Sequence, residues 1–146
     1  MAYTLQAIIT IGDEIQSQIP QPLLTVSLGS NVKMIPLSTE VTRLHGIPFC
    51  PLTDDGETET PPSIQKLCEE LSLGRTLAYI EAELFGGSGT QACVIFTDGK
   101  QVAPPIVSEA AINQALQILG VSKGSAFDEF EAVGLGAHRD TDAWLK

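Results

Sequence analysis

The sequence is poor in basic residues: it has eight Lys and Arg side chains against eighteen Asp and Glu side chains. The formal net charge is therefore -10 at pH 7. Nucleic-acid binding depends on neutralising phosphates with Lys and Arg, and anionic membrane surfaces attract basic segments. The charge balance argues against nucleic acid and membrane lipid as partners. It is suited to a basic protein partner, which a negative surface attracts over long distances, although the favoured interpretation is that an acidic composition is common in soluble proteins and by itself implies no partner.

Aromatic residues are also scarce, at 5% of the sequence. The core must therefore be built mainly from Leu, Ile, Val and Ala. No apolar run approaches the roughly 20 residues that a membrane-spanning helix needs. The N-terminus has neither the basic segment nor the apolar block of a signal peptide, so a cytoplasmic location is expected.

The three cysteines, Cys50, Cys68 and Cys93, are odd in number and form no Cys-x-x-Cys motif. Cys68 and Cys93 lie within apolar patterns. Free, buried thiols in a reducing compartment are therefore expected rather than a disulfide framework.

The sequence has 146 residues and is 43% hydrophobic, values typical of one globular domain spanning residues 1–146. Apolar periodicity predicts an α+β fold built on a mainly antiparallel sheet of five or six strands. Strands are expected over residues 2–11, 23–28, 32–37, 77–85, 90–97 and 100–103. The two main helices are expected at Ser63–Leu73 and Ser108–Leu119, packed on one face of the sheet.

Shorter elements are expected between these. A helical turn is predicted at Glu14–Gln18, and a short helix is predicted up to His45, capped by Ser38 or Thr39. The segment Ile47–Pro62 is rich in proline and acidic residues, which predicts a solvated surface loop.

The central hairpin, Leu77–Thr97, carries the first candidate site. Glu81 and Glu83 fall on the same face of their strand, roughly 7 Å apart. Such a pair could bind a metal or have shifted pKa values, although a polar face open to solvent is the favoured explanation. The following Gly86-Gly87-Ser88-Gly89 joins two strands, so it predicts a turn and not a phosphate-binding loop.

The second candidate is the run His138-Arg139-Asp140 near the C-terminus. His138 could act as a base or metal ligand with Asp140 orienting it, and Arg139 could hold an anionic group. The alternative is structural: Gly134 ends a helix, and a last turn capped by Asp140 or Thr141 docks Trp144. A combined site of Glu81, Glu83, His138 and Arg139 requires the tail to fold over the central sheet.

No motif identifies a catalytic residue, a resident metal or a cofactor. The Gly-x-Ser-x-Gly elbow of serine hydrolases is absent, and so are the glycine motifs that bind nucleotides.

The second half resembles a group of small uncharacterised bacterial proteins. The resemblance covers roughly residues 77–145. It rests on the stretches 78–83, 85–87, 112–116, 119–121, 128–130 and 134–136, together with Gln91, His138, Arg139 and Trp144. The group implies no activity and no functional residues.

The sequence therefore favours a non-enzymatic binding protein, with an immunity or regulatory role toward a basic protein partner. The alternative is a small metal- or ligand-dependent enzyme using Glu81, Glu83, His138 and Arg139. A homo-oligomer that pairs through the polar strand face or through the strand edge at Pro36 is a third hypothesis.

Overall fold

The computed structural model describes residues 2–12, 15, 23–85 and 88–145. Its strands are β1 (Ala2–Ile11), β2 (Val26–Ser27), β3 (Val32–Pro36), β4 (Thr76–Phe85), β5 (Ser88–Thr97), β6 (Lys100–Gln101) and β7 (Ile106–Ser108). Its α-helices are α1 (Thr39–His45), α2 (Pro62–Leu71), α3 (Ala111–Ile118) and α4 (Glu129–Val133). Three 3-10 helices are η2 (Gly29–Asn31), η3 (Leu135–Ala137) and η4 (Asp142–Leu145). The predicted α+β class is confirmed.

The strands form one antiparallel sheet, whose order within the described residues is β2-β3-β1-β4-β5-β6. β7 also pairs with β5, which makes seven strands. The long strands β1, β4 and β5 form its centre, where Gln6 lies opposite Glu81 and Glu81 lies opposite Ala92. β7 was not predicted because it has only three residues and directly follows Pro104-Pro105, too short a run to show alternation.

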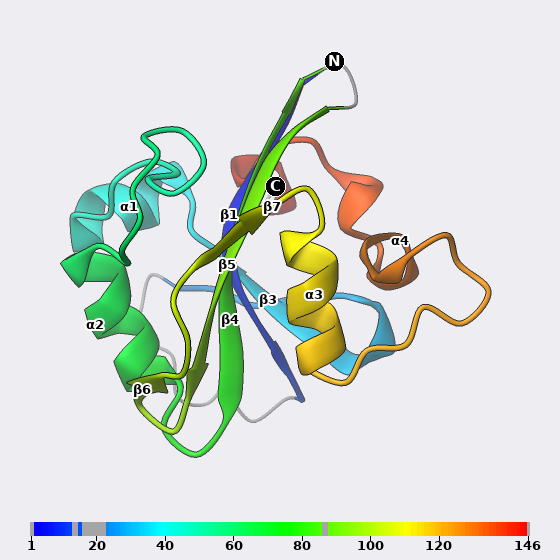
Figure 1. Cartoon of the computed structure of the whole chain (residues 1–146), viewed down its shortest axis with the longest axis horizontal. Helices are drawn as coiled ribbons and strands as arrows, with labels where there is room; N and C mark the ends of the chain where they lie inside the picture. The colour runs from blue at the N-terminus through cyan, green and yellow to red at the C-terminus, as the bar shows by residue number, and fades with distance from the viewer. Residues whose placement is uncertain (1, 13–14, 16–22, 86–87, 146) are drawn as a thin grey trace.

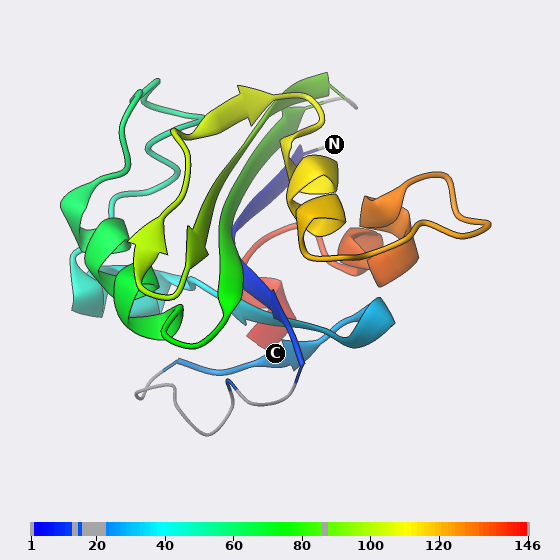
Figure 2. The ribbon, with the colours of Figure 1, turned by 60° about the horizontal axis from the view of Figure 1, so that its bottom comes forward.

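The two main helices lie on opposite faces of the sheet, so the prediction that both cover one face was wrong (Figures 1 and 2). On β4, Ala78 and Ile80 belong to the cluster that contains α3, whereas Leu77 and Tyr79 belong to the cluster that contains α2. Because successive strand residues point to opposite faces, both faces of β4 are apolar at this level. Each face therefore needs its own cover.

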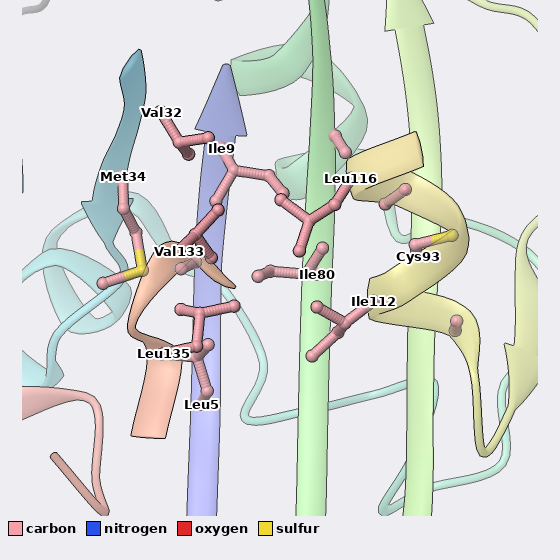
Figure 3. Packing of buried hydrophobic residues seen from close by; sticks show 14 of the residues in the cluster. Leu5, Ile9, Val32, Met34, Ile80, Cys93, Ile112, Leu116, Val133 and Leu135 are labelled. Carbon is pink, nitrogen blue, oxygen red and sulfur yellow. The ribbon is translucent and has the colours of Figure 1, made fainter. Parts of the chain in front are cut away.

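The α3 face carries a core of aliphatic side chains from several elements. Figure 3 shows Ile9 and Ile80 from the sheet facing Ile112 and Leu116 of α3, with Leu135 below them. All five side chains are fully buried. Among the described residues, the aromatics at this core are partly buried at its margin (Tyr3, Phe130 and Trp144), whereas the core on the α2 face contains the fully buried Tyr79 and Phe96.

The helices begin at polar groups that are local in α1 and distant in α3. The α1 helix starts locally, because the Ser38 side chain accepts from the Val41 N–H and Gly46 ends the helix in a left-handed conformation. In α3, however, the Ile112 N–H donates to the Gln91 side chain of β5 at 3.0 Å. None of the helices in the described ranges is long and apolar enough to cross a membrane.

Two predictions fall outside the described residues. The helical turn expected at Glu14–Gln18 does so except for Ile15, and so do Gly86 and Gly87 of the hairpin turn. The strands on either side of that turn pair from Phe85↔Ser88 to Thr76↔Thr97, as the predicted hairpin requires.

The two isoleucines of α3 provide a matched test of this packing. Ile112 is fully buried and Ile118 is 54% exposed. We expect Ile112→Ala to lower the free energy of unfolding by about 2–5 kcal/mol, because the substitution leaves a cavity in the core. Ile118→Ala should change it by less than about 0.5 kcal/mol. Urea denaturation measures both, and equal losses would contradict the assigned orientation of α3.

Candidate functional site

The two predicted carboxylates lie on the same face of β4 but in different environments. Both fall on the α2 face of the sheet, as the alternation from Tyr79 predicts. Glu81 is fully buried, whereas Glu83 is half-buried near the end of the strand. Glu81 therefore occupies a position inside the fold, and Glu83 occupies a position near the surface.

The Glu81 carboxylate is held by a ring of donors from the segment after Ile47. It accepts from the Leu52 N–H at 3.2 Å, the Thr53 N–H at 2.9 Å and the Thr53 hydroxyl at 2.9 Å. The Tyr79 hydroxyl donates to its other oxygen at 2.6 Å. A buried carboxylate is tolerated only when its oxygens are hydrogen-bonded in this way. Because it accepts from these four donors, the Glu81 carboxylate fixes the segment after Ile47 to β4.

The network continues across the sheet into β1. The Gln6 side chain is 1% exposed, and its amide donates to the Tyr79 hydroxyl and to the Pro48 carbonyl, both at 2.9 Å. Burial raises the pKa of Tyr79 well above its ordinary value, and the charge and hydrogen bond of Glu81 raise it further. Tyr79 is therefore a permanent donor at neutral pH, and it links β1, β4 and the loop.

Only the outer part of the segment Ile47–Pro62 is the solvated loop that was predicted. Ile47, Cys50 and Leu52 are buried, and the last two lie within four residues of Asp54. Cys50 has a φ of 38°, in a region that L-residues rarely adopt and that costs about 1–3 kcal/mol. The hydrogen bonds of Glu81 to the next turn compensate for this cost. The prediction missed the buried half because a carboxylate inside a strand gives no sequence sign of its partners.

The three cysteines are free and buried, as predicted. Burial raises the pKa of Cys93 to about 11, and it also raises the pKa values of Cys50 and Cys68. Because the thiolate is the reactive form, these thiols act as small apolar side chains.

The loop beyond Thr53 carries a set of exposed carboxylates, here called the acidic loop: Asp54, Asp55, Glu57 and Glu59. Asp54 lies next to Glu83. Partial burial, followed by the charge of Asp54 and its hydrogen bond, raises the pKa of Glu83 above its usual value. Among the described residues, no Lys or Arg forms an ion pair with the acidic loop.

The C-terminal tail lies along the edge of β1 at residues 139–141, whereas Leu135 and Trp144 pack against the core on the α3 face of the sheet. The Thr4 N–H donates to the Arg139 carbonyl at 2.8 Å, and the Gln6 N–H donates to the Thr141 hydroxyl at 3.0 Å. β3 pairs with β1 only from Ala7 onward. The tail thus takes the place of β3 along the first half of β1.

The side chains of the tail serve mainly to anchor it. Asp140 accepts from the Ala143 N–H at 2.8 Å, and Asp142 accepts from the Thr39 N–H at 2.9 Å. The exposed His138 ring meets the Trp144 ring edge-on, with 4.6 Å between centroids. The structural alternative, a last turn capped by Asp140 that docks Trp144, is the arrangement observed.

The structure does not bring the two candidate clusters together. Within the described residues, no hydrogen bond or ion pair joins Glu81 or Glu83 to His138, Arg139 or Asp140, and β1 lies between β4 and the tail. Nor do the described residues contain a group of three or more His, Cys, Asp or Glu side chains that could hold a metal ion. The two-carboxylate, one-imidazole arrangement is therefore not formed.

Comparisons with known proteins identify no relative: no family model, no curated protein and no solved structure matches the chain. The candidate site therefore rests on the chemistry of the acidic loop and of the Glu81 network beneath it. The sequence pointed to Glu81 and Glu83, but it did not single out the loop as their partner.

Replacing the central carboxylate tests its role as an anchor. We expect Glu81→Gln to lower the free energy of unfolding by about 1–3 kcal/mol, because the amide cannot accept from all four donors. Hydrogen exchange at the Leu52 and Thr53 amides should become faster. Glu83→Gln is the matched control on the same face, and these two amides should keep their protection in that variant. Unchanged exchange in Glu81→Gln would show that the loop is held by other contacts.

The Glu83–Asp54 pair predicts a specific pH dependence. The pKa of Glu83 is higher in the folded state, so the folded state binds more protons than the unfolded state. Protonation of Glu83 therefore stabilises the fold at low pH, and this stabilisation is lost as the pH rises through the folded-state pKa. Glu83→Gln should therefore stabilise the protein relative to wild type at pH 7, and the difference should shrink as the pH falls below 4.5. Chemical denaturation at several pH values measures the difference in the free energy of unfolding between the variant and wild type. A difference independent of pH would be inconsistent with the pairing of Glu83 and Asp54.

Proposed function

We propose that this chain is a non-enzymatic binding protein that recognises a basic protein partner through the acidic loop. The observation that carries the proposal is the anchoring of the loop by Glu81, which accepts from Leu52 and Thr53 immediately before Asp54. Binding is favoured when a recognition loop is already ordered, because less conformational entropy is lost. The Glu81 network thus supports a loop that is held ready for a partner.

The charge pattern supports a basic partner. Asp55, Glu57 and Glu59 are exposed, and within the described part of the chain they have no ion-pair partner. Placing like charges together costs stability, and a cationic partner relieves that cost on binding. A second copy of the same chain would bring another acidic loop to the surface, so like-charge repulsion disfavours self-association through this face. Masking the basic surface of a partner, as an immunity or regulatory protein would, is the concrete form of the proposal.

Affinity capture from a cell lysate at two salt concentrations tests the proposal. Wild-type protein should retain a basic protein at about 0.1 M salt and release it at about 1 M, because screening removes interactions between exposed charges. The triple variant Asp55→Asn/Glu57→Gln/Glu59→Gln should bind that protein about tenfold more weakly, a loss of ~1.4 kcal/mol.

The matched control removes three exposed carboxylates elsewhere, in the variant Glu40→Gln/Glu70→Gln/Glu109→Gln. It changes the net charge equally and should keep the wild-type affinity. Capture of no specific protein at either salt concentration would count against the proposal, and so would equal weakening in the two triple variants.

A further inference from the structure

A groove runs beside the acidic loop, between that loop and the segment that connects β6 to β7. It consists of two hollows, with volumes of about 680 Å³ and about 300 Å³. Thr58 and Pro105 line both of them, so the hollows adjoin each other. Each volume suits several side chains of a bound segment.

Hydrogen bonds hold both walls of the groove in place. At one end, the Thr60 hydroxyl donates to the Gln101 side-chain oxygen at 3.0 Å, which ties the loop to β6. The Gln101 amide then donates to the Ala103 carbonyl at 2.9 Å. At the other end, Leu52 lines the smaller hollow and is held by Glu81. The groove is therefore preformed.

The residues that line the groove limit which ligands can bind in it. Its charged residues are Glu57 and Glu59, and its apolar surface comes from Leu52, Val107 and neighbouring residues of the β6–β7 connection. Among the described residues, no Lys or Arg lines either hollow, which disfavours a phosphate ligand. The described lining contains no aromatic side chain, which disfavours a nucleobase or a polyproline helix. A ligand with both cationic and apolar groups fits this lining.

The adjacent strand edge favours an extended backbone. The Val102 N–H donates to the Ile95 carbonyl, so Ile95 turns its backbone groups toward this side of β5. By the alternation of an antiparallel ladder, Cys93 does the same and bonds to its partner Ile106. Val107 therefore directs its own N–H and C=O away from β5, at a sheet edge that is open within the described residues.

We propose that this groove binds an extended, basic segment of the partner protein, with Lys or Arg side chains at Glu57 and Glu59 and apolar side chains against Leu52 and Val107. This inference rests on the proposed function and specifies the form of the ligand. Main-chain pairing with a strand edge is an established mode of peptide recognition, and alternate side chains of such a peptide face the same surface. A segment whose basic and apolar residues both occupy every second position, on the face turned to the groove, matches both the edge and the lining.

The probe is a capped hexapeptide with lysine, valine and lysine at every second position, separated by serines, titrated into isotopically labelled protein and followed by NMR. Chemical-shift changes should be confined to residues 52–60 and 101–108. The double variant Glu57→Gln/Glu59→Gln should bind the peptide about five- to tenfold more weakly. The control Glu40→Gln/Glu109→Gln, which removes the same charge elsewhere, should bind it as wild type does.

A second variant tests the groove itself. Thr58 is exposed and lines both hollows, so Thr58→Trp should fill the shared space and block the peptide without changing the thermal unfolding midpoint. Shift changes spread over the whole acidic surface would overturn the inference, and so would equal binding of spermine, a polyamine without a peptide backbone. If the hexapeptide does not bind but the protein captured from lysate still depends on the acidic loop, the groove inference fails and the proposed function stands.

Discussion

The rest of the structure depends on one buried carboxylate. Glu81 lies at the centre of the sheet, fully buried, and accepts hydrogen bonds from Leu52, Thr53 and Tyr79. Without those donors, burial of the charge would be prohibitively unfavourable, so the loop must pack where the carboxylate lies. The requirement is mutual, because the loop has Cys50 at a positive φ and needs a strong acceptor to stay folded. The hydrogen bonds that the buried Glu81 carboxylate needs thereby determine the shape of the surface formed by the loop.

That constraint connects the core of the protein to its acidic face. The same few residues that satisfy Glu81 place the acidic loop beside Glu83 and form one wall of the groove near Val107. The remaining surface features have structural duties. The tail completes the edge of β1, and Asp142 accepts from the Thr39 N–H at the start of α1, so the Asp142 carboxylate is engaged within the fold. The acidic loop carries exposed negative charge that no Lys or Arg among the described residues pairs with, and charge of this kind favours recognition of a cation.

Most strands and helices could be predicted, because their signals are local. Period-two alternation identified β1 and the β4–β5 hairpin, and the apolar stripes identified α2 and α3. The sidedness of the helices could not be predicted. Leu77 and Ala78 are both apolar, so the pattern does not indicate which face of the sheet each helix covers. The strand β7 was missed because three residues after two prolines carry too little periodicity.

By itself, the sequence determined the fold class, the aliphatic composition of the core, the free buried thiols and the strongly negative charge. Each of these follows from composition or from short-range periodicity. Only the tertiary structure decided what the polar residues do, because their partners are distant in the chain. Glu81 lies 28 residues from Thr53, and Gln6 lies 135 residues from Thr141. Hydrogen bonds over such separations leave no sequence pattern, so folding assigned Glu81 to the interior and the acidic loop to the surface.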